Sequence, residues 1–425
     1  MAKKRGNNEG SIRERKKGQW EGRVTIGRKP DGSPNRVSFY GPSRAEVATK
    51  ITDALSKLQT GTFVEPNKVT VNQWLEKWMK LYQESTISPN FYARRKDLIR
   101  IHIVPAIGNI QLLKLKPSDI KKLYNDLEKS GRKPAKKKNG KTIPLKEGTP
   151  KGLATGTIRH IHNILNPAMK QAVKEGLVPK NVVADAQPPK IIRTREAKPL
   201  SKDQVSKYLG ILKENRLYAA FLLDLITGLR RGELIGLQWK DLNMQTGALI
   251  IRRQITRIEK EDGKSSLEYA PLKTPASYRT IMLPSVALNE LKAHRKRQAA
   301  EELLAGNKYN KEEGLIFSTP FGGKLDTRHL YRVHCKALED ADLEHTAFHD
   351  LRHSCTTLLL QAGENIKTIQ NLLGHSDIET TLNCYSHVLE EMKMSAADKL
   401  DSIFTEVLNP KEPVQESDSV TEHTN

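Results

Sequence analysis

The sequence is poor in cysteine and in aromatic residues, and it contains no long apolar segment. Its 425 residues include 3 cysteines, and aromatic residues make up 5% of the chain. The cysteines show no paired CxxC spacing, which disfavours a disulfide framework and agrees with a reducing cytoplasm. No apolar run approaches the roughly 18 residues that a membrane-spanning helix needs. The first residues lead into no apolar stretch, so no secretory signal is expected there.

Acidic residues are outnumbered by basic ones. The 49 Asp and Glu residues stand against 71 Lys and Arg residues, which gives a formal net charge of +22. A surplus of this size attracts polyanions, and nucleic acid is the first candidate because each neutralised phosphate releases a condensed counterion. The charge alone indicates a class of binding partner and does not indicate which reaction, if any, the protein catalyses. The hydrophobic content of 37% permits packed cores, and the length favours several domains.

A small basic module is predicted over residues 1–62. Residues 11–15, 20–26 and 36–40 have the character of strands, and Asp31-Gly32 is a turn signal between the last two. Ser43 and Glu46 form a capping box before a helix over residues 44–58. Two interpretations stay open: an ordinary basic mini-domain, or a three-stranded sheet that docks DNA through Lys and Arg on its exposed face.

An all-helical domain is predicted over residues 66–186. A Thr70–Gln73 capping box and apolar spacing indicate a first helix, and further helices are expected over residues 91–104, 118–127 and 157–175. Pro105 and Gly108 are expected to stop the second of these. The polar stretch 132–152 is either a solvated loop or a flexible strip on phosphate. Basic side chains that either contact phosphate or merely solvate a helix are Arg94, Arg95, Lys96, Arg100 and Arg159.

The rest of the chain is predicted to be a linker, a larger domain and a tail. Prolines and basic residues indicate an extended linker over residues 187–200. Residues 201–405 are mostly helical, with a β interruption at residues 248–258 and 279–283. Residues 406–425 are polar and expected to be disordered. The fold class is therefore multidomain and mainly α with small β elements, and the last domain is mixed α/β but mostly helical.

Four short stretches of this last domain contain residues suited to chemistry. A buried helix ends at Gly228, and the cation that follows such a break can project into a cleft. The pair His349 and Arg352, spaced i and i+3, is expected on one helix face. The candidate residues of the four stretches are Arg230 with Glu233, Lys273, His349 with Arg352, and His375 with Tyr385.

In their order and spacing these stretches resemble the signature of the tyrosine recombinase family. That signature is an Arg after a TGLR turn, a Lys in a hairpin, an H-x-x-R motif, a Gly-His pair and a late Tyr. The similarity covers residues 200–400 at motif level, and Glu233 also fits the family pattern. Residues 66–186 resemble the core-binding domain by position and pattern. Residues 1–62 resemble the arm-binding domain of integrases from phages and conjugative transposons.

The resemblance implies a role for each candidate. Two guanidinium groups, Arg230 and Arg352, match the oxygens of a phosphate under attack, and preorganised charge of this kind is worth roughly a hundredfold or more in rate. Tyr385 is the nucleophile, and because a tyrosine has a pKa of about 10 it needs a base, for which His349 is the candidate. Lys273 is the general acid for the leaving 5′ oxygen, with Lys264 as the competitor for this role. His375 donates a hydrogen bond to a non-bridging oxygen, and Glu233 is an orienting carboxylate.

The function implied by the resemblance is site-specific integration or excision of a mobile element. The enzyme would form a 3′-phosphotyrosyl intermediate and exchange strands through a Holliday junction. It would act as a homotetramer on double-stranded DNA with core and arm-type sites, in a bacterial cytoplasm or nucleoid or in the host cell of a phage. An excisionase and a DNA-bending host protein are implied partners. A type IB topoisomerase and a non-catalytic DNA-binding regulator are the alternatives.

No cofactor and no metal are expected. The i, i+4 spacing of His349 and His353 could suggest zinc, but position 350 is Asp and the glutamate of an HExxH motif is absent. Cys384 and His387 have a spacing that fits no standard metal site.

Overall fold

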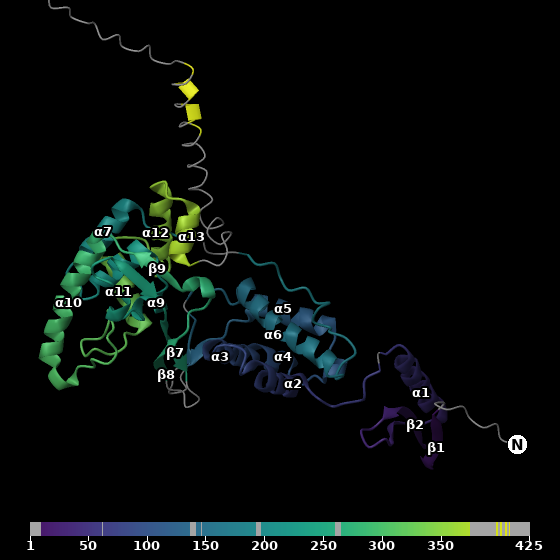
Figure 1. The fold of residues 1–425 in the computed structure, drawn as a ribbon. Coiled ribbons are helices and arrows are strands. Elements are labelled where there is room, and N and C mark those ends of the chain that lie inside the picture. Colours follow the sequence, from purple (N-terminus) through teal and green to yellow (C-terminus); the bar gives the residue numbers. More distant parts are fainter. Residues whose placement is uncertain are drawn as a thin grey trace, which may run out of the picture. The chain divides into compact units, whose positions relative to one another are not determined.

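The computed structural model describes residues 10–61, 63–136, 142–145, 147–192, 197–259 and 265–374, and in addition residues 397, 400, 401, 404, 405 and 408. The chain divides into an N-terminal unit, residues 1–194, and a C-terminal unit, residues 195–425. The division falls within the stretch predicted as a linker. The fold class is confirmed, since helices dominate and the sheets are small (Figure 1). Within the described residues, no helix is both long and apolar enough to cross a membrane.

A three-stranded antiparallel sheet and one helix form the first part of the N-terminal unit (Figure 1). The strands are β1 (Ser11–Lys16), β2 (Gln19–Arg28) and β3 (Pro34–Gly41), paired in that order, and α1 (Arg44–Gln59) follows. The Ser43 side chain accepts a hydrogen bond from the backbone of Glu46 at 3.2 Å, whereas the Glu46 carboxylate accepts from Lys50. The capping box is therefore only half formed. The small core contains Val24, Val47 and Ile51.

The second part of the N-terminal unit is helical and has its own core. Its helices are α2 (Val71–Trp78), α3 (Pro89–Leu98), α4 (Val104–Ile107), α5 (Pro117–Ser130) and α6 (Thr155–Lys174), with the turns η1 (Met79–Gln83), η2 (Ile99–Ile103) and η3 (Leu112–Lys114). The Thr70–Gln73 capping box is present. Residues of the polar stretch 132–152 form the short strands β4 (Ala135–Lys136) and β5 (Thr142–Ile143).

The predicted helix stop at Pro105 and Gly108 is correct only for Gly108, because the helical path passes Pro105 and ends at Ile107. The π-helical turn η2 comes directly before, and its last bond runs from the Val104 amide to the Ile99 carbonyl. Pro105 thus lies in the first turn of α4, where an amide has no partner within its own helix. The missing N–H of proline costs nothing at such a position.

The C-terminal unit surrounds a buried helix, α8 (Tyr218–Thr227), whose residues face the core on nearly every side. The other helices of the unit are α7 (Lys202–Leu212), α9 (Arg231–Ile235), α10 (Ser285–Ala305), α11 (Thr327–Asp340), α12 (Asp350–Gln361) and α13 (Ile366–Leu373), with the short turns η4 (Trp239–Asp241) and η6 (Gly306–Lys308). Of these, α7, α10 and α12 pack against α8.

The β segment of this unit forms two separate two-stranded sheets. β6 (Ala248–Ile251) pairs with β9 (Arg279–Met282), and β7 (Gln254–Glu259) pairs with β8 (Ser265–Ala270). The β segment predicted over residues 248–258 is therefore present, but it is divided into two strands that belong to different sheets. The chain changes sheets at residues 252 and 253, where Arg253 pairs with the buried Asp241. Residues 271–278, which include η5 (Pro275–Ser277), return the chain from β8 to β9 and pass the candidate site.

Candidate active site

Arg230 lies where the buried helix α8 gives way to α9. Gly228 ends α8 in the left-handed conformation, with φ at +58°, and a Cβ there would come within 2.6 Å of the Leu373 side chain. The Arg230 guanidinium donates to Glu233 Oε1 at 2.7 Å, to Ser277 Oγ at 3.1 Å and to the Gly374 carbonyl at 3.3 Å. Its side chain is still 29% exposed. The group is thus fixed from one side and accessible from another.

Glu233 connects Arg230 to a second arginine, Arg279. The carboxylate is 2% exposed, and its Oε2 accepts from Arg279 Nη2 at 3.0 Å. Burial alone raises the pKa of Glu233, but the charge of Arg279 and the hydrogen bond from Arg230 outweigh it and lower the pKa. Glu233 therefore stays ionised and orients both arginines.

Arg352 is more deeply buried than Arg230 and Arg279, and these three residues are called the arginine cluster below. It is 2% exposed, and it donates to the Gly228 carbonyl at 2.6 Å and to the Leu373 carbonyl at 2.8 Å. Desolvation, together with the charges of Arg230 and Arg279, lowers its pKa to about 10, so it remains a cation at neutral pH. Arg352 thereby joins the end of α8 to the end of α13, the turn that precedes His375 in sequence.

The charges of this cluster do not cancel. Asp224 lies on α8, 1% exposed, and neither of its carboxyl oxygens has a hydrogen-bond partner. Burial raises its pKa well above the usual value, which favours the neutral acid. Among the described residues of the cluster, the three arginines Arg230, Arg279 and Arg352 outnumber the two carboxyl groups, Glu233 and Asp224. This surplus of positive charge is suited to an anionic group such as a phosphate.

His349 lies at the N-terminal end of α12 and not within it. The residue is the N-cap, its backbone angles are helical (φ −67°, ψ −18°) and Arg352 follows in the first turn, so the i and i+3 spacing keeps both on one side of the helix as predicted. Its ring meets that of His353 edge-on, with the centroids 5.3 Å apart. Desolvation and the charges of Arg352 and His353 lower its pKa to about 4, although part of the side chain remains exposed. His349 is therefore unprotonated at neutral pH, with a nitrogen lone pair that can accept a hydrogen bond.

Lys273 lies in the connection from β8 to β9 and not in a hairpin turn. Its neighbour Leu272 is buried, whereas Lys273 is exposed. Thr274 Oγ1 and Ser277 Oγ lie 2.9 Å apart, and Ser277 also accepts from Arg230. The segment that carries Lys273 is thus joined to the arginine cluster by hydrogen bonds.

Two further catalytic candidates, His375 and Tyr385, lie outside the described residues, as do Lys264, Cys384 and His387. Gly374 is described, and its carbonyl accepts from Arg230. In the described part of the chain, no group of three or more His, Cys, Asp or Glu side chains could bind a metal ion.

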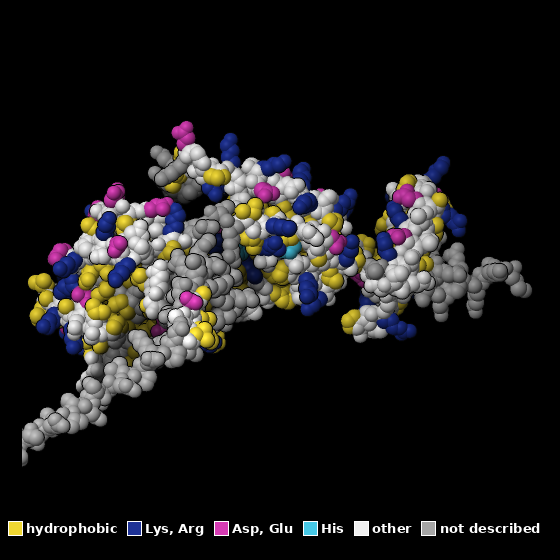
Figure 2. All heavy atoms as spheres, turned by 90° about the horizontal axis from the view of Figure 1, so that it is seen from above, with side chains coloured by type: hydrophobic (Ala, Val, Ile, Leu, Met, Phe, Trp, Pro, Cys, Tyr) yellow, Lys and Arg dark blue, Asp and Glu magenta, His cyan; other side chains and the backbone are white. Residues whose placement is uncertain are grey.

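The basic candidates of the helical domain differ in their contacts and in their exposure. Arg95 lies over the Phe91 ring at 4.6 Å, and Arg100 pairs with Asp97 at 2.7 Å. Arg159 on α6 donates to the Pro189 carbonyl at 3.3 Å. Arg94 and Lys96 are exposed. On the face shown in Figure 2, Lys and Arg side chains are spread over the surface and are not confined to one segment.

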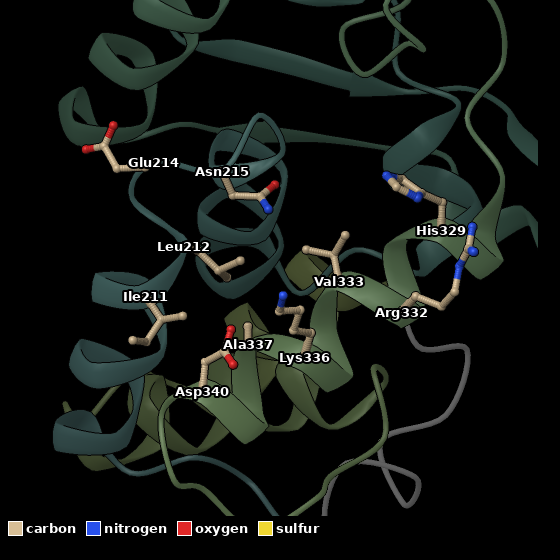
Figure 3. A pocket seen from close by; sticks show the side chains of 10 residues that line it. All are labelled: Ile211, Leu212, Glu214, Asn215, His329, Arg332, Val333, Lys336, Ala337 and Asp340. Atoms are coloured by element: carbon tan, nitrogen blue, oxygen red, sulfur yellow. The ribbon is translucent and has the colours of Figure 1, made fainter.

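A cavity of about 600 Å³ lies elsewhere in the C-terminal unit, between α7 and α11. Ile211 and Leu212 face it from α7, and Arg332 and Lys336 from α11 (Figure 3). None of the predicted catalytic residues within the described part of the chain lines it. It is therefore separate from the candidate active site.

Sequence reasoning missed Arg279 and Ser277. A signal for Arg279 was present: strand residues two apart share a face, and Arg279 shares its face with the buried Ile281. A cation aligned with a buried apolar residue needs an anionic partner. Ser277 gave no comparable signal, since its burial depends on a turn that the sequence does not specify.

Comparisons with known proteins agree with this arrangement. Residues 198–392 match the model of the phage integrase family, and residues 70–128 match that of the phage integrase N-terminal SAM-like domain. A tyrosine recombinase XerC-like protein of Caldanaerobacter subterraneus subsp. tengcongensis is 31% identical over 90% of this chain and 95% of its own length. The ICEBs1 integrase of Bacillus subtilis is 27% identical over 74% of this chain and 78% of its own.

Solved structures show the same fold at lower identity. The Tn1549 transposon integrase in complex with transposon right end DNA is 22% identical, with a TM-score of 0.61, and covers 78% of this chain and 99% of that one. A lambda integrase tetramer bound to a Holliday junction is 19% identical, with a TM-score of 0.50, and the match covers 86% of this chain and 95% of that one.

The fold and the matching domains define an integrase-type enzyme that acts on DNA. The chain belongs to the tyrosine recombinase family, that is, the phage integrase family, and it is a site-specific DNA recombinase.

Proposed function

We propose that Tyr385 attacks a DNA phosphate, releases a 5′ hydroxyl and forms a 3′-phosphotyrosyl bond. The 5′ hydroxyl of a partner strand then attacks this bond, and two such rounds through a Holliday junction complete integration or excision of a mobile element. The observation that supports the proposal is the cluster around Arg230, in which the arginines outnumber the carboxyl groups. Its charge is opposite to the one that develops on a pentavalent phosphorane, which is where fixed cations lower a barrier.

The other candidates supply the proton transfers and the orientation. His349, neutral at neutral pH, takes the proton of the Tyr385 phenol. Lys273 protonates the leaving 5′ oxygen, and its exposure agrees with a group that meets DNA. His375 donates a hydrogen bond to a non-bridging oxygen. Glu233 touches no DNA and orients Arg230.

A nicked substrate tests the proposal. The attachment site is first recovered by sequencing insertion junctions, and a duplex nicked next to the cleavage position is then incubated with the full chain, so that the released fragment diffuses away. We expect a covalent protein–DNA adduct that survives denaturation and is absent for Tyr385→Phe. No adduct with the unchanged chain would contradict the proposal. Strand exchange between two sites, measured next, separates a recombinase from a topoisomerase.

We further propose that the domains divide DNA binding among themselves: residues 1–62 bind arm-type sites, and residues 66–186 and 201–405 bind the core site. Support for the first assignment is the exposed face of the sheet. Arg13 Nη2 lies 2.7 Å and Arg23 Nε 3.1 Å from Glu21, which is 1% exposed beneath them. The pKa of Glu21 is lowered to about 2, and the hydrogen bond from Arg13 is the largest cause. An ionised Glu21 therefore keeps two surface arginines in fixed positions.

The double variant Arg13→Ala with Arg23→Ala should bind DNA from the flanks of the attachment site more weakly. The slope of log affinity against log salt should also become shallower by about 1 for every phosphate that the variant no longer neutralises. The measurement is fluorescence anisotropy over a series of salt concentrations. Arg44→Ala, at the start of α1, is the control. The assignment fails if the double variant and the control have the same slope and affinity.

We also propose that the chain works as a homotetramer on two double-stranded DNA sites in a bacterial cytoplasm or nucleoid, or in the host cell of a phage. The lambda integrase tetramer on a Holliday junction supports this assembly by analogy. A DNA-bending host protein would bring arm and core sites together, and an excisionase would favour excision. Cross-linking of the chain on a synthetic four-way junction tests the tetramer.

A further inference from the structure

Arg279 has more hydrogen-bond partners than an ion pair with Glu233 requires. Besides that ion pair, its Nε donates to the Leu372 carbonyl at 2.6 Å, and its Nη1 donates to the Ser277 carbonyl at 2.9 Å. Its side chain is 7% exposed. All three guanidinium nitrogens thus have partners on three different segments: α9, the end of α13, and the connection that carries Lys273.

These three segments pack closely where Arg279 joins them. Gly374, in the left-handed conformation at φ +66°, lies so near that a Cβ would come within 2.8 Å of the Ala276 carbonyl and 3.1 Å of Arg279 Nη1. Ser277 is fully buried and accepts from Arg230. A shift of any one segment would therefore move the others.

We propose that Arg279 is a positioning residue for DNA cleavage. It keeps the Lys273 segment, the Arg230–Glu233 pair and the turn before His375 in one arrangement, and it does not touch the phosphate itself. The inference rests on the proposed function, because it concerns the same site. The contrast with Arg230 supports it: Arg230 is 29% exposed, whereas Arg279 is nearly covered and its nitrogens already have partners.

Arg279→Lys tests the proposal in the full chain. Lysine keeps the charge but lacks the planar fork that reaches three partners. We expect the single-turnover rate of adduct formation, at saturating protein, to fall at least about tenfold. DNA affinity should stay within about threefold, because Arg279 is not at the surface. Arg253→Lys is the matched control, since Arg253 also pairs with a buried carboxylate, Asp241, but has no contact with the cluster in the described structure.

A second substrate distinguishes positioning from a general weakening of the fold. In it, sulfur replaces the bridging 5′ oxygen of the scissile phosphate. As Tyr385 forms its bond to phosphorus, the phosphorus–sulfur bond breaks and a thiolate leaves with the electron pair. A thiolate needs no proton from Lys273, because a thiol is far more acidic than an alcohol. The defect of Arg279→Lys should therefore be smaller on the sulfur substrate, whereas the defect of Arg230→Lys should be equal on both.

The outcomes separate the two proposals. If the unchanged chain forms no adduct, the proposed function itself fails. If the unchanged chain cuts DNA and Arg279→Lys cuts within about threefold of its rate, only the role of Arg279 is overturned. An equal defect on both substrates would also overturn it, since the Lys273 segment would then not depend on Arg279.

Discussion

Arg230→Lys is expected to slow DNA cleavage by about 10²- to 10³-fold while the chain stays folded. The guanidinium contacts Glu233, Ser277 and Gly374 from two nitrogens and is still partly exposed. A lysine can replace the ion pair with Glu233, so little stability is lost. It cannot make that contact and also present a planar pair of donors to a phosphate. The defect should therefore lie in the rate and not in the fold.

The measurement is the single-turnover rate of adduct formation on the nicked substrate, together with the midpoint of thermal unfolding. Arg231→Lys is the control, because Arg231 is the next residue and is exposed. We expect it to cut DNA at the rate of the unchanged chain. Arg230→Lys cutting at that rate would remove Arg230 from the catalytic machinery.

The parts of this site that sequence reasoning found are those with a local cause. The apolar run of α8 and the glycine after it predict a buried helix that ends at Gly228, because glycine adopts a positive φ without strain. The capping box at Thr70, in the helical domain, is local as well, since its partner lies three residues away. Such signals are contained in a few adjacent residues and need no knowledge of the rest of the fold.

The parts it did not find depend on contacts between distant residues. Arg230 reaches the Gly374 carbonyl across 144 positions, and Arg352 reaches the Gly228 carbonyl across 124. No local pattern shows which carbonyl an arginine will meet. The burial of Ser277 and the bridging position of Arg279 also become visible only in three dimensions.

Arg352→Lys is expected to lower both cleavage and stability, in contrast to Arg230→Lys. Arg352 is 2% exposed and gives hydrogen bonds to the carbonyls of Gly228 and Leu373. A lysine amine is a single point and cannot span both carbonyls as the guanidinium does. A buried carbonyl without a donor costs roughly 1–3 kcal/mol. We therefore expect the C-terminal unit to lose about 2–4 kcal/mol, which for a domain of this size lowers its unfolding midpoint by about 5–12 °C.

Cleavage should fall at least about a hundredfold even below the unfolding temperature, because the ends of α8 and α13 would no longer be joined beside Arg230. Arg332→Lys, exposed on α11 of the same unit, should change neither quantity. An unaltered melting curve for Arg352→Lys would contradict the structural role. The burial of Asp224 matters here, because it disfavours the ionised form of that acid, which would offset the charge of Arg352. One guanidinium thus both joins two helix ends and contributes positive charge for the phosphate.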